Sequence, residues 1–184
     1  MTLTAEKESD HFAPFCLVET IKHYQLNSQT EMIPSVIGRI QEDLRRLKLF
    51  DSTDEMRIAM ALSEALLNAI EHGNLEVSST LREGDDEGYA RLIKERSHQS
   101  PYAERRVDLI ARKSAEEVVY VVQDEGPGFN PDDLPDPTDP ANLEKVSGRG
   151  VLLIRSLMDS VTYNERGNQI TMIKRYGNLV AAVS

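Results

Sequence analysis

Two side chains with useful chemistry stand four residues apart near the middle of the chain. Glu64 carries a carboxylate, which can accept a proton, and Asn68 carries an amide oxygen, which can bind a hard metal ion. The surrounding pattern is helical, so residues four apart lie one turn apart on the same face. Leu62, Leu66 and Ala69 project the opposite way. Taken alone, this pattern is more typical of a solvated helix surface than of a site.

A pair of glycines follows a predicted buried strand further along the chain. Residues 118–122 are apolar and mostly β-branched, and Gln123 and Asp124 come directly after them. Gly126 and Gly128 follow at alternate positions. Glycine lets a backbone come close to neighbouring atoms because no side chain intervenes.

A second glycine pair precedes a predicted helix. Gly148, Arg149 and Gly150 stand just before the apolar run 151–158. The free amides and the positive end of a helix attract anions such as phosphate. Either glycine pair alone is weak evidence for a site.

In this order, the three segments resemble the N, G1 and G2 boxes of the GHKL superfamily of ATPases, which includes gyrase, the histidine kinases and MutL. The narrower resemblance is to the bacterial anti-sigma-factor serine/threonine-protein kinases that act by partner switching, and it spans roughly residues 52–176. It implies ATP and Mg²⁺ as cofactors and a Bergerat-type ATP-binding fold. That fold belongs to the α/β class in the broad sense, and it is an α+β sandwich of two layers. Helices cover one face of a mixed, mainly antiparallel sheet.

The resemblance assigns nucleotide-binding roles to these residues. Asp124 is expected to accept a hydrogen bond from the exocyclic amino group of adenine and to set specificity. Gly126 and Gly128 are expected to let the backbone bend close to the base and ribose. Thr171 stands where relatives place a hydroxyl that helps to hold adenine, although an ordinary strand threonine is an equally good interpretation. The other expected nucleotide-binding residues are Asn68, Gly148, Arg149 and Gly150.

The resemblance also assigns the catalytic chemistry. Phosphoryl transfer depends mainly on positioning and on neutralising charge with Mg²⁺. Asn68 is expected to be the metal ligand, and Glu64 the catalytic base that accepts a proton from an attacking hydroxyl. His72 lies near the same face, where a structural role is the better interpretation. Leu67 departs from the family, since several of its kinases have a threonine there, so a role in nucleotide binding without turnover stays open.

Composition limits the class of protein. The chain has 184 residues, of which 40% are hydrophobic, and this suits a loose tail over 1–11 and a single ATP-binding, kinase-like domain over 12–184. The 21 basic and 31 acidic residues give a net charge of −10, which disfavours direct nucleic-acid binding. A single cysteine, Cys16, excludes an intramolecular disulfide and fits a reducing compartment. The apolar stretch Phe12–Val18 is too short to cross a bilayer, so we expect a cytoplasmic protein without a membrane partner.

The predicted helices have recognisable start and stop signals. Ser28 and Glu31 have capping-box spacing before one apolar period, and Ser52 and Glu55 have the same spacing before the helix of the first box. Gly73 is expected to end that second helix. The first helix carries four basic residues, for which a solvated face is the default and a docking surface for an acidic partner the alternative: Arg39, Arg45, Arg46 and Lys48.

The remaining segments are predicted strands and loops. Three stretches are expected to form strands, the first at a sheet edge and the others as hairpins: 18–26, 107–123 and 161–176. Residues 75–106 are highly charged without a core pattern and contain a possible short helix over 89–98. The corresponding link is usually shorter in the family that the chain resembles, so the resemblance implies an insertion here. We interpret it as a mobile loop, with a partner-specific surface as the alternative. The proline-rich segment 129–147 corresponds by resemblance to the ATP lid.

Two functions compete. The leading hypothesis is an ATP-dependent serine/threonine protein kinase and anti-sigma-factor-like regulator that phosphorylates a small antagonist protein. A sigma factor and a second copy of the chain stay open as further partners. The alternative is a non-catalytic, ATP-gated partner-binding adaptor. Two other family functions are disfavoured. The catalytic half of a histidine kinase needs a histidine on a dimerisation helix, and no histidine in this sequence has that context. Relatives of gyrase and MutL need a following transducer domain, which we do not expect here because only eight residues follow Tyr176.

Overall fold

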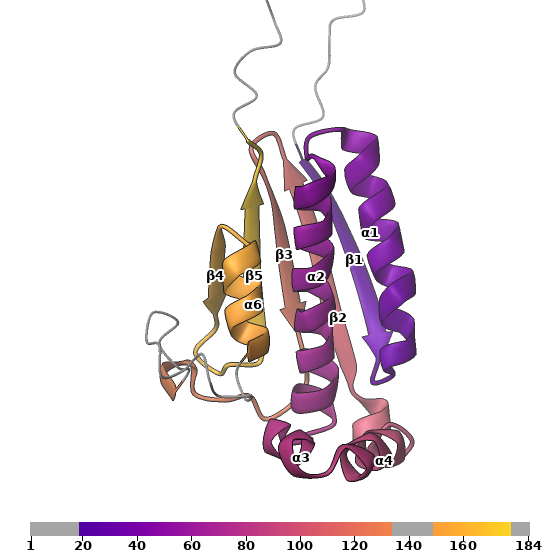
Figure 1. Cartoon of the computed structure of the whole chain (residues 1–184). Coiled ribbons are helices and arrows are strands. Elements are labelled where there is room, and N and C mark those ends of the chain that lie inside the picture. The colour runs from indigo at the N-terminus through magenta and orange to yellow at the C-terminus, as the bar shows by residue number, and fades with distance from the viewer. Residues whose placement is uncertain (1–18, 134–148, 178–184) are drawn as a thin grey trace, which may run out of the picture.

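The structure, a computed structural model, describes residues 19–133 and 149–177, and it consists of one sheet covered on one face by helices (Figure 1). The strands are β1 (Glu19–Asn27), β2 (Arg106–Ser114), β3 (Glu117–Gln123), β4 (Ser160–Tyr163) and β5 (Gln169–Arg175). The covering helices are α1 (Ile33–Leu47), α2 (Ser52–Asn68) and α6 (Arg149–Leu157). The strand order is β1-β2-β3-β5-β4, and all four pairings among the described strands are antiparallel. The predicted α/β sandwich with a mainly antiparallel sheet is confirmed, with β1 at an edge as expected.

Shorter elements connect these layers. They are η1 (Thr30–Met32), the π-helix η2 (Ala69–Asn74), α3 (Ser79–Gly84), α4 (Asp86–Arg96), η3 (Tyr102–Glu104) and η4 (Pro131–Asp133). In Figure 1, α3 and α4 lie beyond the end of α2, at the end of the sheet where β1 and β3 finish. The predicted tail, Gly148 and the predicted lid after residue 133 lie outside the described residues. Within the described ranges, the structure contains no helix with the length and apolar character needed to span a membrane.

The core lies between the sheet and α2. Alternate residues of β2 face inward, and Val107, Leu109 and Ala111 are all buried, as the alternation predicts. The inward face of α2 is formed by Ile58, Ala59, Ala61, Leu62, Ala65 and Leu66, which are buried. This burial fixes the rotation of α2, so its opposite face is left for Glu64 and Asn68.

Both predicted capping boxes are wrong. The hydroxyl of Ser28 donates to the carbonyl oxygens of Tyr102 and Arg105, at 3.0 and 3.2 Å, instead of capping a helix. The N-cap of α2 is Asp51, whose carboxylate accepts from the amide of Asp54 at 2.8 Å. A carboxylate also interacts favourably with the positive end of the helix dipole, so Asp51 satisfies this helix start better than the hydroxyl of Ser52.

Residues 75–106 form helices and buried contacts, so the interpretation as a loop without core residues is wrong. Leu75, Val77 and Tyr89 are buried within the main core. The hydroxyl of Tyr89 donates to the carboxylate of Glu71 at 2.6 Å, which ties α4 to η2. These contacts are made by single apolar residues within a charged sequence. Such residues produce no periodic hydrophobic pattern, so the sequence did not reveal them.

Candidate functional site

Glu64 and Asn68 lie one turn apart on the face of α2 that is turned away from the core. Both side chains are half-buried, whereas Leu62 and Leu66 on the opposite face are fully buried. Neither Glu64 nor Asn68 makes a side-chain hydrogen bond or ion pair with any residue in 19–133 or 149–177. A carboxylate and an amide oxygen therefore lie side by side on this face without a partner among the described residues.

The first turn of α6 meets the carboxylate of Glu64. A Cβ atom built on Gly150 would overlap Oε1 of Glu64, so only glycine permits this approach without moving the carboxylate. α6 begins at Arg149, and its positive end therefore lies beside Glu64. Two of the three predicted boxes meet at this contact.

Gly73 has a different role from the one predicted. The helix does not end there, because the chain continues as the π-helix η2 to Asn74, and Gly73 lacks the positive φ of a helix-ending glycine. A Cβ on Gly73 would lie 2.6 Å from Oδ1 and 2.7 Å from Oδ2 of Asp124. Gly73 therefore allows the carboxylate of Asp124 to pack against η2, which joins the first and second boxes.

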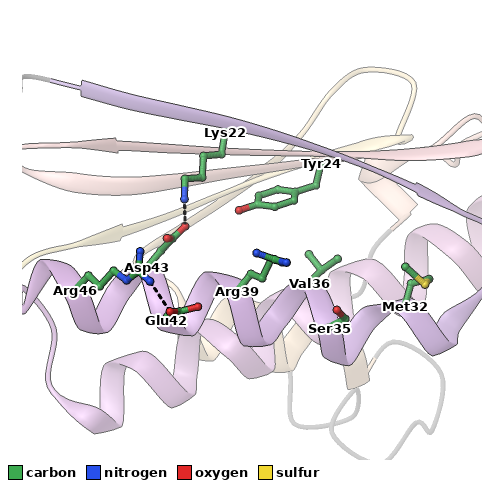
Figure 2. A pocket seen from close by; sticks show the side chains of 9 residues that line it. All are labelled: Lys22, Tyr24, Met32, Ser35, Val36, Arg39, Glu42, Asp43 and Arg46. Atoms are coloured by element: carbon green, nitrogen blue, oxygen red, sulfur yellow. Dashed lines mark hydrogen bonds and ion pairs between the residues drawn. The ribbon is translucent and has the colours of Figure 1, made fainter.

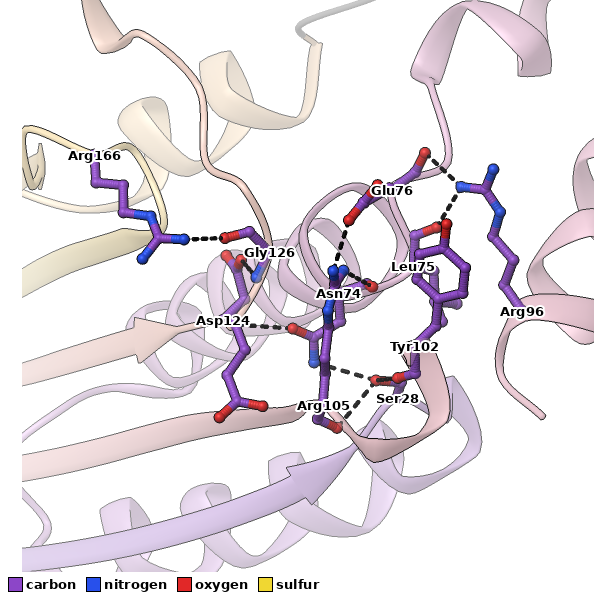
Figure 3. A network of polar contacts seen from close by, with 11 residues as sticks. Ser28, Asn74, Leu75, Glu76, Arg96, Tyr102, Arg105, Asp124, Gly126 and Arg166 are labelled. Atoms are coloured by element: carbon purple, nitrogen blue, oxygen red, sulfur yellow. Dashed lines mark hydrogen bonds and ion pairs between the residues drawn. The ribbon is translucent and has the colours of Figure 1, made fainter. Parts of the chain in front are cut away.

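Asp124 is held in a buried position by its neighbours (Figure 3). The residue is 9% exposed, and its Oδ1 accepts from the amide of Gly126 at 2.8 Å. Burial raises the pKa of Asp124 to about 6, although the Gly126 amide and the positive charges of Arg166 and Arg105 oppose the rise. An acceptor in a poorly solvated position suits recognition of a neutral amino donor.

Gly126 and Gly128 are required by the protein's own backbone. A Cβ on Gly126 would overlap the carbonyl oxygen of Gly73, and one on Gly128 would overlap that of Arg166. Gly128 also has a φ of +78°, which a side chain disfavours. The close approach that we attributed to base and ribose is therefore already needed for packing in the protein itself.

Thr171 lies on the wrong face of the sheet for the predicted role. It pairs with Val121 and Thr162, whereas its neighbour Met172 pairs with Tyr120, and both Met172 and Tyr120 are buried under the helices. Successive side chains of a strand alternate between faces, so Thr171 faces away from α2. We therefore remove Thr171 from the candidate site.

Asn168 is a site neighbour that the sequence analysis missed. It is 5% exposed, its side-chain amide donates to the carbonyl oxygen of Asp124 at 2.8 Å, and its own carbonyl accepts from the Asp124 amide at 3.0 Å. In the sequence, Asn168 follows Gly167 within the predicted hairpin 161–176, where it has the character of a turn residue. Asparagine is common in turns, so the residue type alone does not indicate a role in the site. The contact between Asn168 and Asp124 becomes visible only when β3 is paired with β5.

The residues fit Mg²⁺ through Asn68 alone. In the part of the chain that the structure describes, no group of three or more His, Cys, Asp or Glu side chains is arranged to hold a metal. In phosphate-binding sites, most ligands of Mg²⁺ are water and phosphate oxygens, so one amide oxygen is a sufficient protein ligand.

His72 is engaged elsewhere, because its Nδ1 lies 2.6 Å from the carbonyl oxygen of Val77. This contact supports the structural role predicted for His72.

A separate pocket of about 460 Å³ lies between α1 and β1 (Figure 2). Its walls contain Lys22, Tyr24, Met32, Ser35, Val36, Arg39, Glu42, Asp43 and Arg46. Lys22 pairs with Asp43 at 2.6 Å, and Arg46 pairs with Glu42 at 2.5 Å. Arg45 also pairs with Glu55, at 3.4 Å, so two of the four basic residues predicted on this helix are neutralised within the chain. These ion pairs favour the solvated-face interpretation over a docking surface for an acidic partner.

Comparisons with known proteins agree with this fold. Residues 26–174 match the family model of the histidine kinase-like ATPase domain. No match was found among curated proteins. Among solved structures, the chain is similar to "the RsbU and RsbW domains of Rv1364c from Mycobacterium tuberculosis", with a TM-score of 0.50 and 15% sequence identity. The similarity covers 85% of this chain and 32% of that one, so the chain spans about a third of the length of that solved structure.

Proposed function

Since the chain belongs to the family of histidine kinase-like ATPase domains, we propose that it is an ATP-dependent serine/threonine protein kinase and anti-sigma-factor-like regulator. Its substrate is a small antagonist protein in a partner-switching pathway, and the protein works in the cytoplasm. The observation that carries the proposal is the contact of Glu64 with Gly150, which joins a proton acceptor to the end of a helix suited to phosphate.

The nucleotide lies between α2 and the segments that follow β3. The carboxylate of Asp124 accepts a hydrogen bond from the amino group of adenine. The first amides of α6, at Arg149 and Gly150, bind the phosphates together with Gly148. This assignment places the terminal phosphate next to Glu64, because Gly150 is already in contact with that side chain.

Transfer then follows from the position of Glu64. Its carboxylate accepts the proton of a serine or threonine hydroxyl, whose oxygen forms a bond to the γ-phosphorus. The bond from that phosphorus to the bridging oxygen breaks, and ADP leaves. Asn68 holds Mg²⁺, which neutralises phosphate charge when it is bound. A sigma factor is the second partner when the antagonist is phosphorylated or absent.

The second candidate is a non-catalytic adaptor in which ATP controls partner binding. Leu67 favours it, because this side chain packs against the core where several related kinases carry a threonine. Both candidates need the same nucleotide site. They differ only in whether Glu64 moves a proton.

The two candidates are separated by incubating the pure protein with γ-labelled ATP, Mg²⁺ and size-fractionated extract from its own cells. The kinase predicts labelled serine or threonine on a small protein, and no label when the Glu64→Gln protein replaces wild type. The adaptor predicts no label with either protein, but partner exchange that follows ATP occupancy.

Nucleoside binding is expected to weaken as the pH falls through about 6. The pKa of Asp124 is raised to about 6, so below that pH the carboxyl is protonated and loses its full acceptor strength. Adenosine is the best probe, because it has no phosphate that titrates in this range. Its affinity, measured by calorimetry between pH 5 and 8, should fall by up to about tenfold per pH unit below the pKa. A flat profile would contradict the assignment of Asp124 to adenine.

Gly150→Ala is expected to slow phosphoryl transfer by about tenfold or more while the protein stays folded. The new Cβ displaces the carboxylate of Glu64, and a flexible side chain moves at little energetic cost to the fold. Single-turnover transfer and circular dichroism measure the two effects. Gly84→Ala is the matched control, since a Cβ at Gly84 meets nothing within 4 Å. Equal transfer rates in both variants would show that the position of Glu64 does not matter.

A further inference from the structure

The side chain of Asn74 holds the peptide that follows Asp124 (Figure 3). Asn74 ends η2 and is fully buried. Its Oδ1 accepts from the amide of Glu125 at 2.8 Å, and its Nδ2 donates to the hydroxyl of Ser28 at 3.2 Å. One amide therefore connects the end of the first box to the start of the second box and to the end of β1.

Arg105 braces Asn74 from the opposite side. Its Nη1 donates to the carbonyl oxygen of Asn74 at 2.6 Å, and its Nη2 pairs with Oε1 of Glu76 at 2.7 Å. The side chain is only 20% exposed, so solvent weakens these charged hydrogen bonds little. Arg105 thus fixes the backbone from which the amide of Asn74 projects.

Residues 75–106 support Arg105 in turn. The guanidinium groups of Arg96 and Arg105 lie 4.9 and 5.2 Å from the centre of the Tyr102 ring, within cation–π range. Arg96 also donates to the carbonyl oxygens of Leu75 and Glu76, at 2.7 and 2.8 Å. The charged segment is therefore bound to the turn that carries Asn74.

We propose that Asn74 is a positioning residue for adenine recognition, and that Arg105 holds it in place. The inference rests on the proposed function, in which Asp124 accepts from adenine. Asn168 fixes the backbone of Asp124 on one side, and Asn74 fixes the next peptide on the other. Together they set the direction of the Asp124 carboxylate. A hydrogen bond weakens steeply with distance and angle, so a small tilt of this peptide reduces discrimination between bases.

The test compares affinities for ATP and inosine triphosphate, measured by calorimetry with Mg²⁺. The two nucleotides carry the same phosphates and ribose, but inosine has a carbonyl oxygen where adenine has its amino group. The ratio of the two affinities therefore reports on the contact with Asp124. The variants are Asn74→Ala and Arg105→Ala. Arg112→Ala is the control, because it also removes a charge and an ion pair, with Glu19 at 3.5 Å.

Both test variants are expected to lower the preference for ATP by about two- to tenfold, the equivalent of one net hydrogen bond. The affinity for inosine triphosphate should stay at the wild-type value, which also shows that the variant is folded. Arg112→Ala should match wild type in both affinities. If Asn74 has only a structural role, the affinities for ATP and for inosine triphosphate should fall together, and that result would overturn the inference. An unchanged ratio of the two affinities would also overturn it.

Two further outcomes keep the conclusions separate. If Asn74→Ala does not fold, the inference is tested by Arg105→Ala alone. The side chain of Arg105 is partly exposed, so its removal does not leave a fully buried cavity as the removal of the Asn74 side chain does. If wild type and Asp124→Asn give the same ratio, adenine is not recognised by Asp124, and the proposed nucleotide role fails together with this inference. If those two proteins differ but the test variants match wild type, only the inference fails.

Discussion

Glu64→Gln is expected to lower phosphoryl transfer by about 10²–10⁴-fold while ATP still binds. Glutamine has almost the same size and helix propensity as glutamate, but its amide does not accept a proton from the substrate hydroxyl. The side chain is half-buried beside the first turn of α6, and it has no hydrogen bond or ion pair with the described residues, so the fold should not depend on its charge. Single-turnover transfer and calorimetry with ATP measure the two effects separately.

Two comparisons sharpen this result. Glu95→Gln makes the same change on an exposed position of α4, and it should leave transfer and binding unchanged. Asn68→Ala removes the metal ligand, so it should weaken binding of Mg-ATP and transfer together. A wild-type rate in Glu64→Gln would show that Glu64 is not the base, and the ATP-gated adaptor would then be the better account.

The sequence predicted the layers for clear physical reasons. The helix of Glu64 has an apolar stripe of 3.6-residue period, and β2 and β3 alternate or are uniformly apolar, so each element is identified by its own residues. Glu64 and Gly150 were both singled out by the family resemblance, and their contact became visible only in the structure.

Other features depend on contacts that no local pattern contains. In the π-helix at Ala69–Asn74, Gly73 packs against the carboxylate of Asp124, but the sequence of this turn is equally compatible with an ordinary helix end. The face on which Thr171 lies depends on the register between β3 and β5, and a shift of one residue would reverse it. The role of Asn168 is visible only once these two strands are paired.

The charged segment 75–106 was misjudged for a related reason. Its buried contacts come from single residues, such as Tyr89 against Glu71 and Tyr102 against two arginines, rather than from a repeating apolar face. Composition indicates solvent exposure for such a segment. The charges of Arg96 and Arg105 are instead directed at backbone carbonyl oxygens of the site, at 2.6–2.8 Å.

Asp124→Asn is expected to weaken ATP binding and, at the same time, to stabilise the fold at neutral pH. The amide presents a donor or a weaker acceptor to the amino group of adenine, and losing this polar match in a closed site commonly costs ~1–3 kcal/mol, or about five- to 150-fold in affinity. The charged carboxylate of Asp124 also destabilises the folded protein, because its burial is unfavourable and raises its pKa to about 6. Asparagine has no charge to desolvate, and its Oδ1 still accepts from the amide of Gly126.

The stability effect has a defined pH window. The pKa of Asp124 lies higher in the folded protein than in the unfolded chain, where it is about 4. The protonated carboxyl therefore contributes stability that is complete below pH ~4 and is lost as the pH rises through about 6. At pH 8 the variant should be more stable than wild type by roughly 1–3 kcal/mol, and by pH 4 this difference should vanish. Urea unfolding at both pH values, with Asp86→Asn as an exposed control, measures it. Weaker ATP binding together with lower stability at pH 8 would mean that Asp124 is needed for the fold, and an unchanged ATP affinity would remove it from the adenine site.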